Sequence, residues 1–137
     1  MANRVYAKEW LTFAYKNLLT AQHLYDVEHF TDIIIIDLQQ ALEKTLKALL
    51  AYQNLKIPKS HYLDELSSLT ELISFTDDDL TLLERTTDFY KDDRYPNPNY
   101  TLPTLEETSL TLEFTNELFD KVCLKLNISK EELLNVE

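Results

Sequence analysis

Apolar residues recur at intervals of three and four along most of the chain, which is the spacing of one face of an α-helix. The first such series, within residues 10–25, predicts a helix from about Val5 to Val27. The second series predicts a helix from about Phe30 to Asn54. This second helix is apolar over most of its circumference, so we expect it to lie at the centre of the fold or in a subunit interface.

A narrow polar stripe interrupts the apolar surface of the second predicted helix. Its members are spaced three, four and three residues apart: Asp37, Gln40, Lys44 and Lys47. We interpret Lys44 and Lys47 on this stripe as part of a solvent-exposed face or, alternatively, as the lining of a dimer groove. Glu43 and Lys47, four residues apart, should form a favourable ion pair. The isoleucines at 33–36 prefer strands, but the following QQALEKTLKALL favours a helix in both propensity and period.

Two further helices are predicted by their starting residues. Pro58 ends the second helix, and Ser60 is a plausible N-cap for a third helix from His61 to about Ile73. Thr76 then caps a fourth helix that should run to about Lys91. The three aspartates that follow Thr76 suit the positive end of a helix dipole, and consecutive helical residues point in different directions, so we interpret them as capping rather than metal-binding residues.

Capping boxes mark the last two predicted helices. Thr104 with Glu107 opens a fifth helix that should end near Leu126. Ser129 with Glu132 opens a short helix over 129–136.

The composition supports a helical fold. The 137 residues suit a single domain spanning 1–137, with its core over 5–126. The chain contains no glycine, which argues against an all-β fold and excludes glycine-rich phosphate-binding loops. We therefore predict an all-α, antiparallel up-and-down bundle of about five helices, with the second helix at its centre.

Charge and cysteine content exclude several function classes. The net charge of −11 makes nonspecific duplex binding over the whole surface improbable, because such binding depends on phosphate neutralisation. Cys123 is the only cysteine, so a disulfide framework and a cysteine zinc site are excluded, and we expect no metal or cofactor. The N-terminus lacks the apolar region of a signal peptide, and no apolar run is long enough to span a membrane. We expect a cytoplasmic protein.

Positive charge should gather in one place. In an antiparallel bundle the loops after the second and fourth helices lie at the same end, which would bring Lys56, Lys59 and His61 near Lys91 and Arg94. His61 has either a structural role, in which it closes its loop against the second helix, or a functional one, in which it donates a hydrogen bond to an anion or acts as an acid or base.

The loop KDDRYPNPNY at 91–100 holds Arg94 between acids and a proline turn. A residue before proline is pushed out of the α region, so Tyr95 should be extended and the fourth helix should end by about Arg94. Arg94 has two possible roles. Either it pairs with a neighbouring acid such as Asp92 and stabilises the loop, or its guanidinium binds a phosphate.

Three segments, in this order and spacing, resemble the HEPN (higher eukaryotes and prokaryotes nucleotide-binding) domain family. QQALEKTLKALL at 39–50 is similar to the family's Gln-Ala-x-Glu-Lys-x-x-Lys helix. KIPKSHYLDEL at 56–66 is similar to its Pro-x-x-His-x-Leu segment, and DRYP at 93–96 to its Arg-Tyr-Pro. The resemblance implies a helical bundle that commonly forms a homodimer and often works beside a small nucleotidyltransferase.

One branch of that family consists of metal-independent ribonucleases with an Arg-x4–6-His motif. Arg94 could be the arginine, but no histidine follows it, since His23, His29 and His61 all precede it. The resemblance therefore does not extend to the ribonuclease activity, and we expect no strong cleavage of RNA. In the toxin branch a tyrosine near the motif accepts a nucleotide, a pattern that Tyr100 matches only approximately.

Three function classes follow. The first is a module that binds a nucleotide or the end of a single-stranded RNA, as an adaptor or partner of a nucleotidyltransferase. The alternatives are a HEPN-type ribonuclease or toxin with an altered catalytic set, built on Arg94, His61 and Tyr100, and a purely structural helical dimer. The candidate binding residues are Arg94, His61, Lys59, Tyr95, Tyr100, Lys91 and Lys47.

Overall fold

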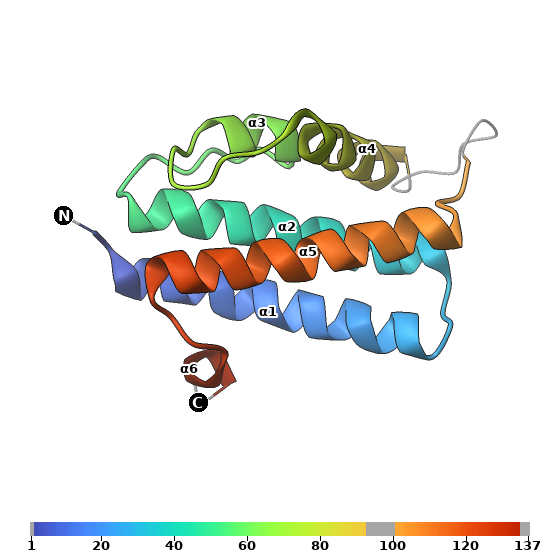
Figure 1. Cartoon of the computed structure of the whole chain (residues 1–137), viewed down its shortest axis with the longest axis horizontal. Coiled ribbons are helices and arrows are strands. Elements are labelled where there is room, and N and C mark those ends of the chain that lie inside the picture. Colours follow the sequence, from blue (N-terminus) through green and yellow to red (C-terminus); the bar gives the residue numbers. More distant parts are fainter. Residues whose placement is uncertain (1, 93–100, 135–137) are drawn as a thin grey trace.

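The computed structural model describes residues 2–92 and 101–134, and these residues form helices and no strand. The helices are α1 (Arg4–Asp26), α2 (Thr31–Tyr52), α3 (Leu63–Ser68), α4 (Asp77–Asp92), α5 (Leu105–Leu126) and α6 (Lys130–Leu134) (Figure 1). The predicted all-α bundle is confirmed. Within the described ranges, no helix combines the length and the apolar character that crossing a membrane requires.

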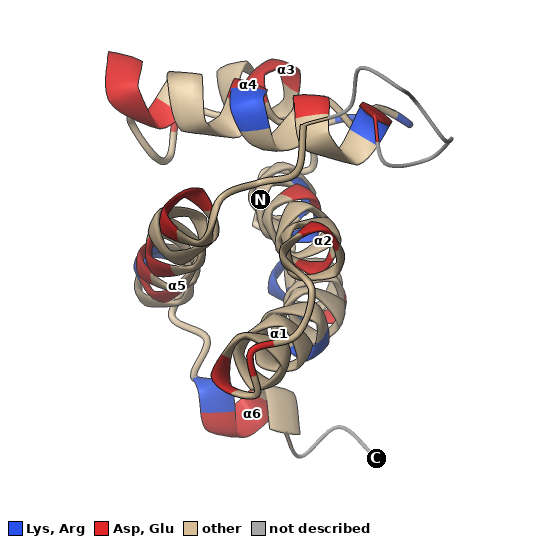
Figure 2. Cartoon of the chain, turned by 90° about the vertical axis from the view of Figure 1, so that its right-hand side faces the viewer, with Lys and Arg blue, Asp and Glu red and all other residues tan. Residues whose placement is uncertain are grey.

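The helices form two layers. The long helices α1, α2 and α5 lie side by side, with α1 antiparallel to the other two (Figure 1). Viewed along these three helices, α3 and α4 lie in a second layer, and α4 runs across the view (Figure 2). The end of α4 that carries Lys91 is on the α2 side, and its acidic first turn is on the α5 side (Figure 2).

Helix α2 is central, as predicted. It packs against α1, α3, α4 and α5. Leu42 and Leu46 are fully buried, and Ile33 is its most exposed large apolar residue at 41%. Apolar burial of this kind is the main driving force for folding. The apolar surface that suggested a dimer is thus covered within one chain.

The prediction that the lysines of the polar stripe on α2 are solvent-exposed is wrong for Lys47, whose exposed fraction is only 6%. Asp37, Gln40 and Lys44 are half-buried. The physical reason is that the segment between α2 and α3 turns back along α2 and covers part of its surface (Figure 1).

The third helix is shorter than predicted. It covers Leu63–Ser68 instead of His61–Ile73, and Ser60 precedes its N-cap, Tyr62. The Ser60 hydroxyl accepts from the Tyr62 N–H at 3.1 Å, which forms a turn one step before the helix. Beyond the helix, the Thr70 hydroxyl accepts from the Leu72 N–H at 3.2 Å and donates to Gln53 at 2.8 Å, so side-chain bonds compete with helical ones.

The caps predicted for α4, α5 and α6 are confirmed, whereas Ser60 is not the N-cap of α3. In the box that opens α5, the Thr104 hydroxyl accepts from the Glu107 N–H and the Glu107 carboxylate accepts from the Thr104 N–H. Reciprocal bonds of the same type join Thr76 with Asp79 and Ser129 with Glu132. Each cap satisfies helix N–H groups that have no partner within the helix.

Candidate functional site

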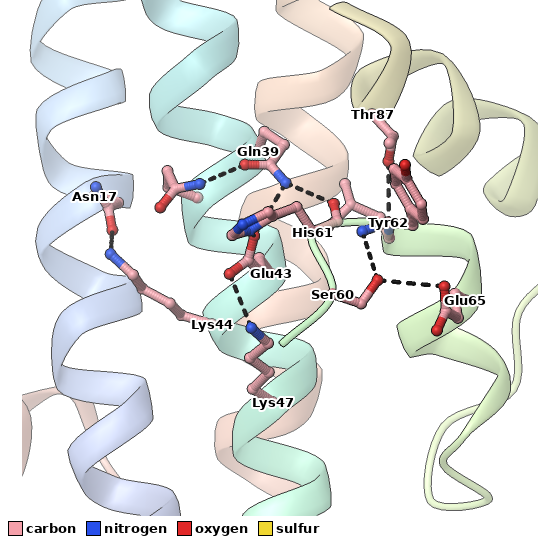
Figure 3. Close-up of polar contacts among 12 residues, drawn as sticks. Asn17, Gln39, Glu43, Lys44, Lys47, Ser60, His61, Tyr62, Glu65 and Thr87 are labelled. Atoms are coloured by element: carbon pink, nitrogen blue, oxygen red, sulfur yellow. Dashed lines mark hydrogen bonds and ion pairs between the residues drawn. The ribbon is translucent and has the colours of Figure 1, made fainter. Parts of the chain in front are cut away.

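A line of buried polar side chains runs along α2. Gln39, Glu43 and Lys47 are spaced four residues apart, so they lie on one face of the helix. Their exposed fractions are 0%, 5% and 6%. His61, in the segment that turns back along α2, lies against this line (Figure 3). The face joins the middle of α2 to the second layer.

Glu43 is the centre of the contacts. Its Oε2 is 3.0 Å from the Lys47 ammonium nitrogen, and its Oε1 is 2.8 Å from Nδ1 of His61. The Gln39 amide nitrogen donates to the His61 carbonyl at 2.9 Å and to Glu43 Oε1 at 3.3 Å. A buried carboxylate is tolerated only when it is paired and hydrogen-bonded, and here both oxygens are satisfied.

The Lys47 ammonium has a second favourable neighbour in Trp10 of α1. Its nitrogen lies 5.6 Å from the centre of the indole ring, within the range of a cation–π interaction. The indole Nε1 is buried and has no hydrogen-bond partner among the described residues. The charge of Lys47 is therefore held by Glu43 on one side and by an aromatic ring on the other.

Beside this line, the half-buried part of the polar stripe contacts α1. The Lys44 ammonium donates to the Asn17 side chain at 2.7 Å (Figure 3). Burial raises the pKa of Asp37, and the hydrogen bond with Asn17 and the nearby charge of Lys44 oppose this shift. Burial also lowers the pKa of Lys44, against the attraction of Glu43 and Asp37. These groups form a polar seam between α1 and α2.

On its outer side, His61 meets the C-terminal half of α4. Its ring centre is 5.6 Å from that of Tyr90, and the Lys91 ammonium is 5.1 Å from the ring of Tyr62. The Leu63 N–H donates to the Thr87 hydroxyl at 3.1 Å, which ties the start of α3 to α4 (Figure 3). The His61 side chain remains 48% exposed, so this is a surface that a ligand could reach.

A shallow pocket of ≈ 250 Å³ adjoins this surface. Its lining combines three of the residues above with three acids: Tyr62, Asp64, Glu84, Thr87, Asp88 and Lys91. The acids limit how much negative charge the pocket could accept.

The structure brings together part of the predicted site. His61 and Lys91 lie on the same surface, next to Tyr90 and Tyr62 respectively. Lys59, two residues before His61, is exposed. Lys47 is buried. Arg94, Tyr95 and Tyr100 lie outside the described residues.

The position of the site along the bundle differs from the expectation. We predicted that His61 lies at the end of the bundle, but it contacts Glu43, at the middle of α2. About nine helical residues separate Glu43 from the end of α2, or roughly 13 Å at 1.5 Å per residue. The ten residues from Gln53 to Tyr62 are enough to return along that distance in a largely extended form.

Sequence reasoning missed Gln39 and Glu43 as site residues and treated Glu43 only as a partner for Lys47. The signal was present in the spacing. Three polar residues at intervals of four on an apolar helix mark a narrow line rather than a broad face, and a narrow line can be covered by one crossing segment.

No group of three metal-ligating side chains is placed to hold a metal ion within residues 2–92 and 101–134. Cys123 is buried, and burial raises the pKa of its thiol to about 11, so it is a poor nucleophile at neutral pH. The chemical groups available at the candidate site are therefore the imidazole of His61 and the cations near it.

Comparisons with known proteins agree with this fold. Residues 7–128 match the family model described as HEPN domain. Two solved structures are similar: TT1696 from Thermus thermophilus, with 23% identity and a TM-score of 0.69, and the archaeal HEPN homologue ST0689, with 19% identity and a TM-score of 0.68. They cover 87% and 88% of this chain, respectively, and in each case 97% of the similar chain is covered. No curated protein sequence matches significantly.

At these identities the two structures support the fold alone, whereas the family model spans most of the chain, from within α1 to just beyond α5. The buried Gln39–Glu43–Lys47 line and the segment that carries His61 both fall inside the matched range. The chain belongs to the HEPN domain family.

Proposed function

We propose that this chain is a HEPN module that binds a nucleotide or the end of a single-stranded RNA at the surface around His61. The observation that carries the proposal is the His61 ring, which is anchored on the buried Glu43 at 2.8 Å and yet half-exposed beside α4. Holding a polar group rigidly at a surface reduces the entropy lost when a ligand binds.

The neighbouring side chains suit a nucleotide. The ring of Tyr62, which is 46% exposed, offers a face on which a base can stack. Lys91 and Lys59 supply cations for a phosphate, and the proposal adds Arg94, Tyr95 and Tyr100, which follow α4 in the sequence. The nearby acids Glu84 and Asp88 favour one terminal phosphate over a long polyanion.

The partners are part of the proposal. We infer that the module works in the cytoplasm as an adaptor or partner of a small nucleotidyltransferase, in agreement with the resemblance of its motifs. It lacks the ribonuclease histidine after Arg94, so binding rather than cleavage is the activity that we propose. The alternative is a HEPN-type ribonuclease with an altered catalytic set, and robust cleavage of single-stranded RNA that His61→Ala abolishes would favour it.

Fluorescence anisotropy with a labelled, 5′-phosphorylated single-stranded RNA, and competition by AMP, test the proposal. His61→Ala, Lys91→Ala and Arg94→Ala should each weaken binding by about tenfold, the effect of losing one hydrogen bond to the ligand. Matched controls are His29→Ala and Lys121→Ala, which remove an exposed histidine before α2 and an exposed lysine on α5. Melting temperatures confirm that each variant is folded.

Two results would overturn the proposal. One is a wild-type protein that binds neither RNA nor AMP at millimolar concentration. The other is an equal loss of binding in the control variants, which would mean that the interaction is not located at this surface.

A further inference from the structure

His61 contacts Glu43 through only one of its two ring nitrogens, and this fixes where its proton lies. An ionised carboxylate can accept hydrogen bonds but cannot donate one. Glu43 forms an ion pair with the Lys47 ammonium at 3.0 Å, and its oxygens are the acceptors of the contacts around it. The 2.8 Å contact between Glu43 Oε1 and Nδ1 of His61 therefore places a proton on Nδ1.

The second nitrogen, Nε2, is then an acceptor in the neutral ring. Among the described residues no hydrogen bond to Nε2 is formed, and the side chain is 48% exposed. Glu43 of α2 contacts the ring, and the ring of Tyr90 of α4 lies 5.6 Å from it, centre to centre. Lys47 contacts the other carboxylate oxygen of Glu43, and Lys91 follows Tyr90 in the sequence. The carbonyl of His61 is also held, by the Gln39 amide at 2.9 Å, so both the backbone and the ring have fixed positions.

We propose that Glu43 is a positioning residue that holds His61 in the Nδ1–H tautomer, and that Nε2 accepts a hydrogen bond from the ribose 2′-hydroxyl of the bound nucleotide or RNA. This inference rests on the proposed function and deepens it, because it assigns a different part of the ligand to each group. A phosphate oxygen is itself an acceptor, so it pairs with the lysines and not with a neutral Nε2. A ribose hydroxyl is a donor and fits.

The consequence is selectivity for ribose. The 2′-hydroxyl is the group by which a protein distinguishes RNA from DNA at a given position. A deoxyribose ligand would leave Nε2 without a partner while keeping the phosphate contacts. The RNA should therefore bind about five- to tenfold more tightly than the DNA of the same sequence.

The first experiment measures the tautomer directly and needs no ligand. Two-bond ¹H–¹⁵N correlation spectra of the full chain, with ¹⁵N-labelled histidine at pH 7.5, distinguish a protonated ring nitrogen from an unprotonated one. His61 should show protonated Nδ1 and unprotonated Nε2. His23 and His29 are exposed and have no carboxylate contact within the described residues, so they serve as internal controls that should exchange between both tautomers.

Variants separate positioning from simple packing. Glu43→Gln should shift His61 toward a mixture of tautomers, because an amide can either accept or donate. Glu43→Asp keeps a carboxylate and should restore the Nδ1–H form if its shorter side chain still reaches the ring. If Glu43→Gln does not fold, the wild-type spectrum still decides. A neutral Nε2–H tautomer or a doubly protonated ring at pH 7.5 would overturn the inference.

The second experiment compares 5′-phosphorylated RNA with DNA of the same sequence by anisotropy. His61→Ala should abolish the preference for RNA, and Lys91→Ala should weaken both ligands equally and preserve it. Equal binding of RNA and DNA by the wild type overturns the hydroxyl assignment while the proposed function stands. Binding of neither ligand overturns the proposed function, and the spectra then still report whether Glu43 positions His61.

Discussion

At the scale of single residues, the most informative group is the carboxylate of Glu43, which the sequence predicted only as the i,i+4 ion-pair partner of Lys47. Glu43 and Lys47 form the predicted i,i+4 pair, but both are buried, so the pair differs from a surface ion pair in energy and in role. The spacing of Gln39, Glu43 and Lys47 could have indicated a buried line. The contact with His61 could not, because it depends on how the segment after α2 returns along the helix.

Removal of one partner of this pair should be far more damaging than removal of both. Glu43→Met leaves the Lys47 ammonium buried without its carboxylate, and we expect a loss of about 3–5 kcal/mol in the free energy of unfolding. The double variant Glu43→Met with Lys47→Met replaces the pair with apolar side chains and should recover most of that loss. Urea denaturation measures both.

The matched control is the exposed pair of Lys130 and Asp120, whose side chains are 40% and 58% exposed. Loss of either partner there should change stability little. A double variant on α2 that is as unstable as Glu43→Met would contradict this interpretation, since it would show that the packing of the side chains matters and not their charge.

At the scale of elements, the caps of α4, α5 and α6 could be predicted from the sequence, whereas the N-cap and the extent of α3 could not. Thr76, Thr104 and Ser129 each open a helix through local bonds that span three residues, so the local pattern is sufficient. The end of α3 depends on Thr70, whose hydroxyl donates to Gln53 at the end of α2. Such a contact between distant residues leaves no local periodic signal.

The capping box of α5 should make stability depend on pH. The pKa of Glu107 is lowered, first by the hydrogen bond from the Thr104 N–H and further by Arg85. Because the folded-state pKa is below the ordinary value of 4.5, the stabilisation is fully present above about pH 4.5. It is lost as the pH falls through the lower, folded-state pKa.

Melting temperatures of the wild type and of Glu107→Gln, measured between pH 7 and pH 3, test this direction of the pH dependence. The wild type should be more stable at pH 7, and the difference should shrink on acidification. A control at the exposed Glu113 of α5, Glu113→Gln, should show a smaller dependence. A difference that stays constant over the whole range would show that the ionised form of Glu107 does not contribute.

At the scale of the whole molecule, helix number, the central place of α2 and the family could be predicted from the sequence, because each follows from patterns that extend over many residues. The crossing of α4 over the first layer could not, since it depends on the short α3 and the path of residues 53–76 (Figure 2). For the same reason the candidate site lies beside the middle of α2 and not at the end of the bundle.

The homodimer stays a prediction. It was based on the apolar surface of α2 and on the family resemblance, and only the resemblance still supports it. Because α2 is covered within one chain, a dimer would have to use another surface, and α1 exposes Val5 at 75% and Phe13 at 57%. We expect sedimentation velocity at micromolar concentration to give a dimer, and Phe13→Glu to weaken it more than Leu124→Glu on α5. A monomeric wild type at that concentration would contradict the prediction.

The way in which α3 is held has a consequence for hydrogen exchange. A helix of six residues is too short to be stable in isolation, so its amide protons are protected only while Leu63 and Leu66 stay buried and Thr87 accepts from the Leu63 N–H. His61 immediately precedes this helix and is bound to the same face of α2. Local opening of residues 61–68, at a free energy below that of global unfolding, would therefore release the His61 ring and expose the α3 amides in a single event. A molecule that binds His61 should slow exchange in α3, even though it contacts none of the amides whose exchange it slows.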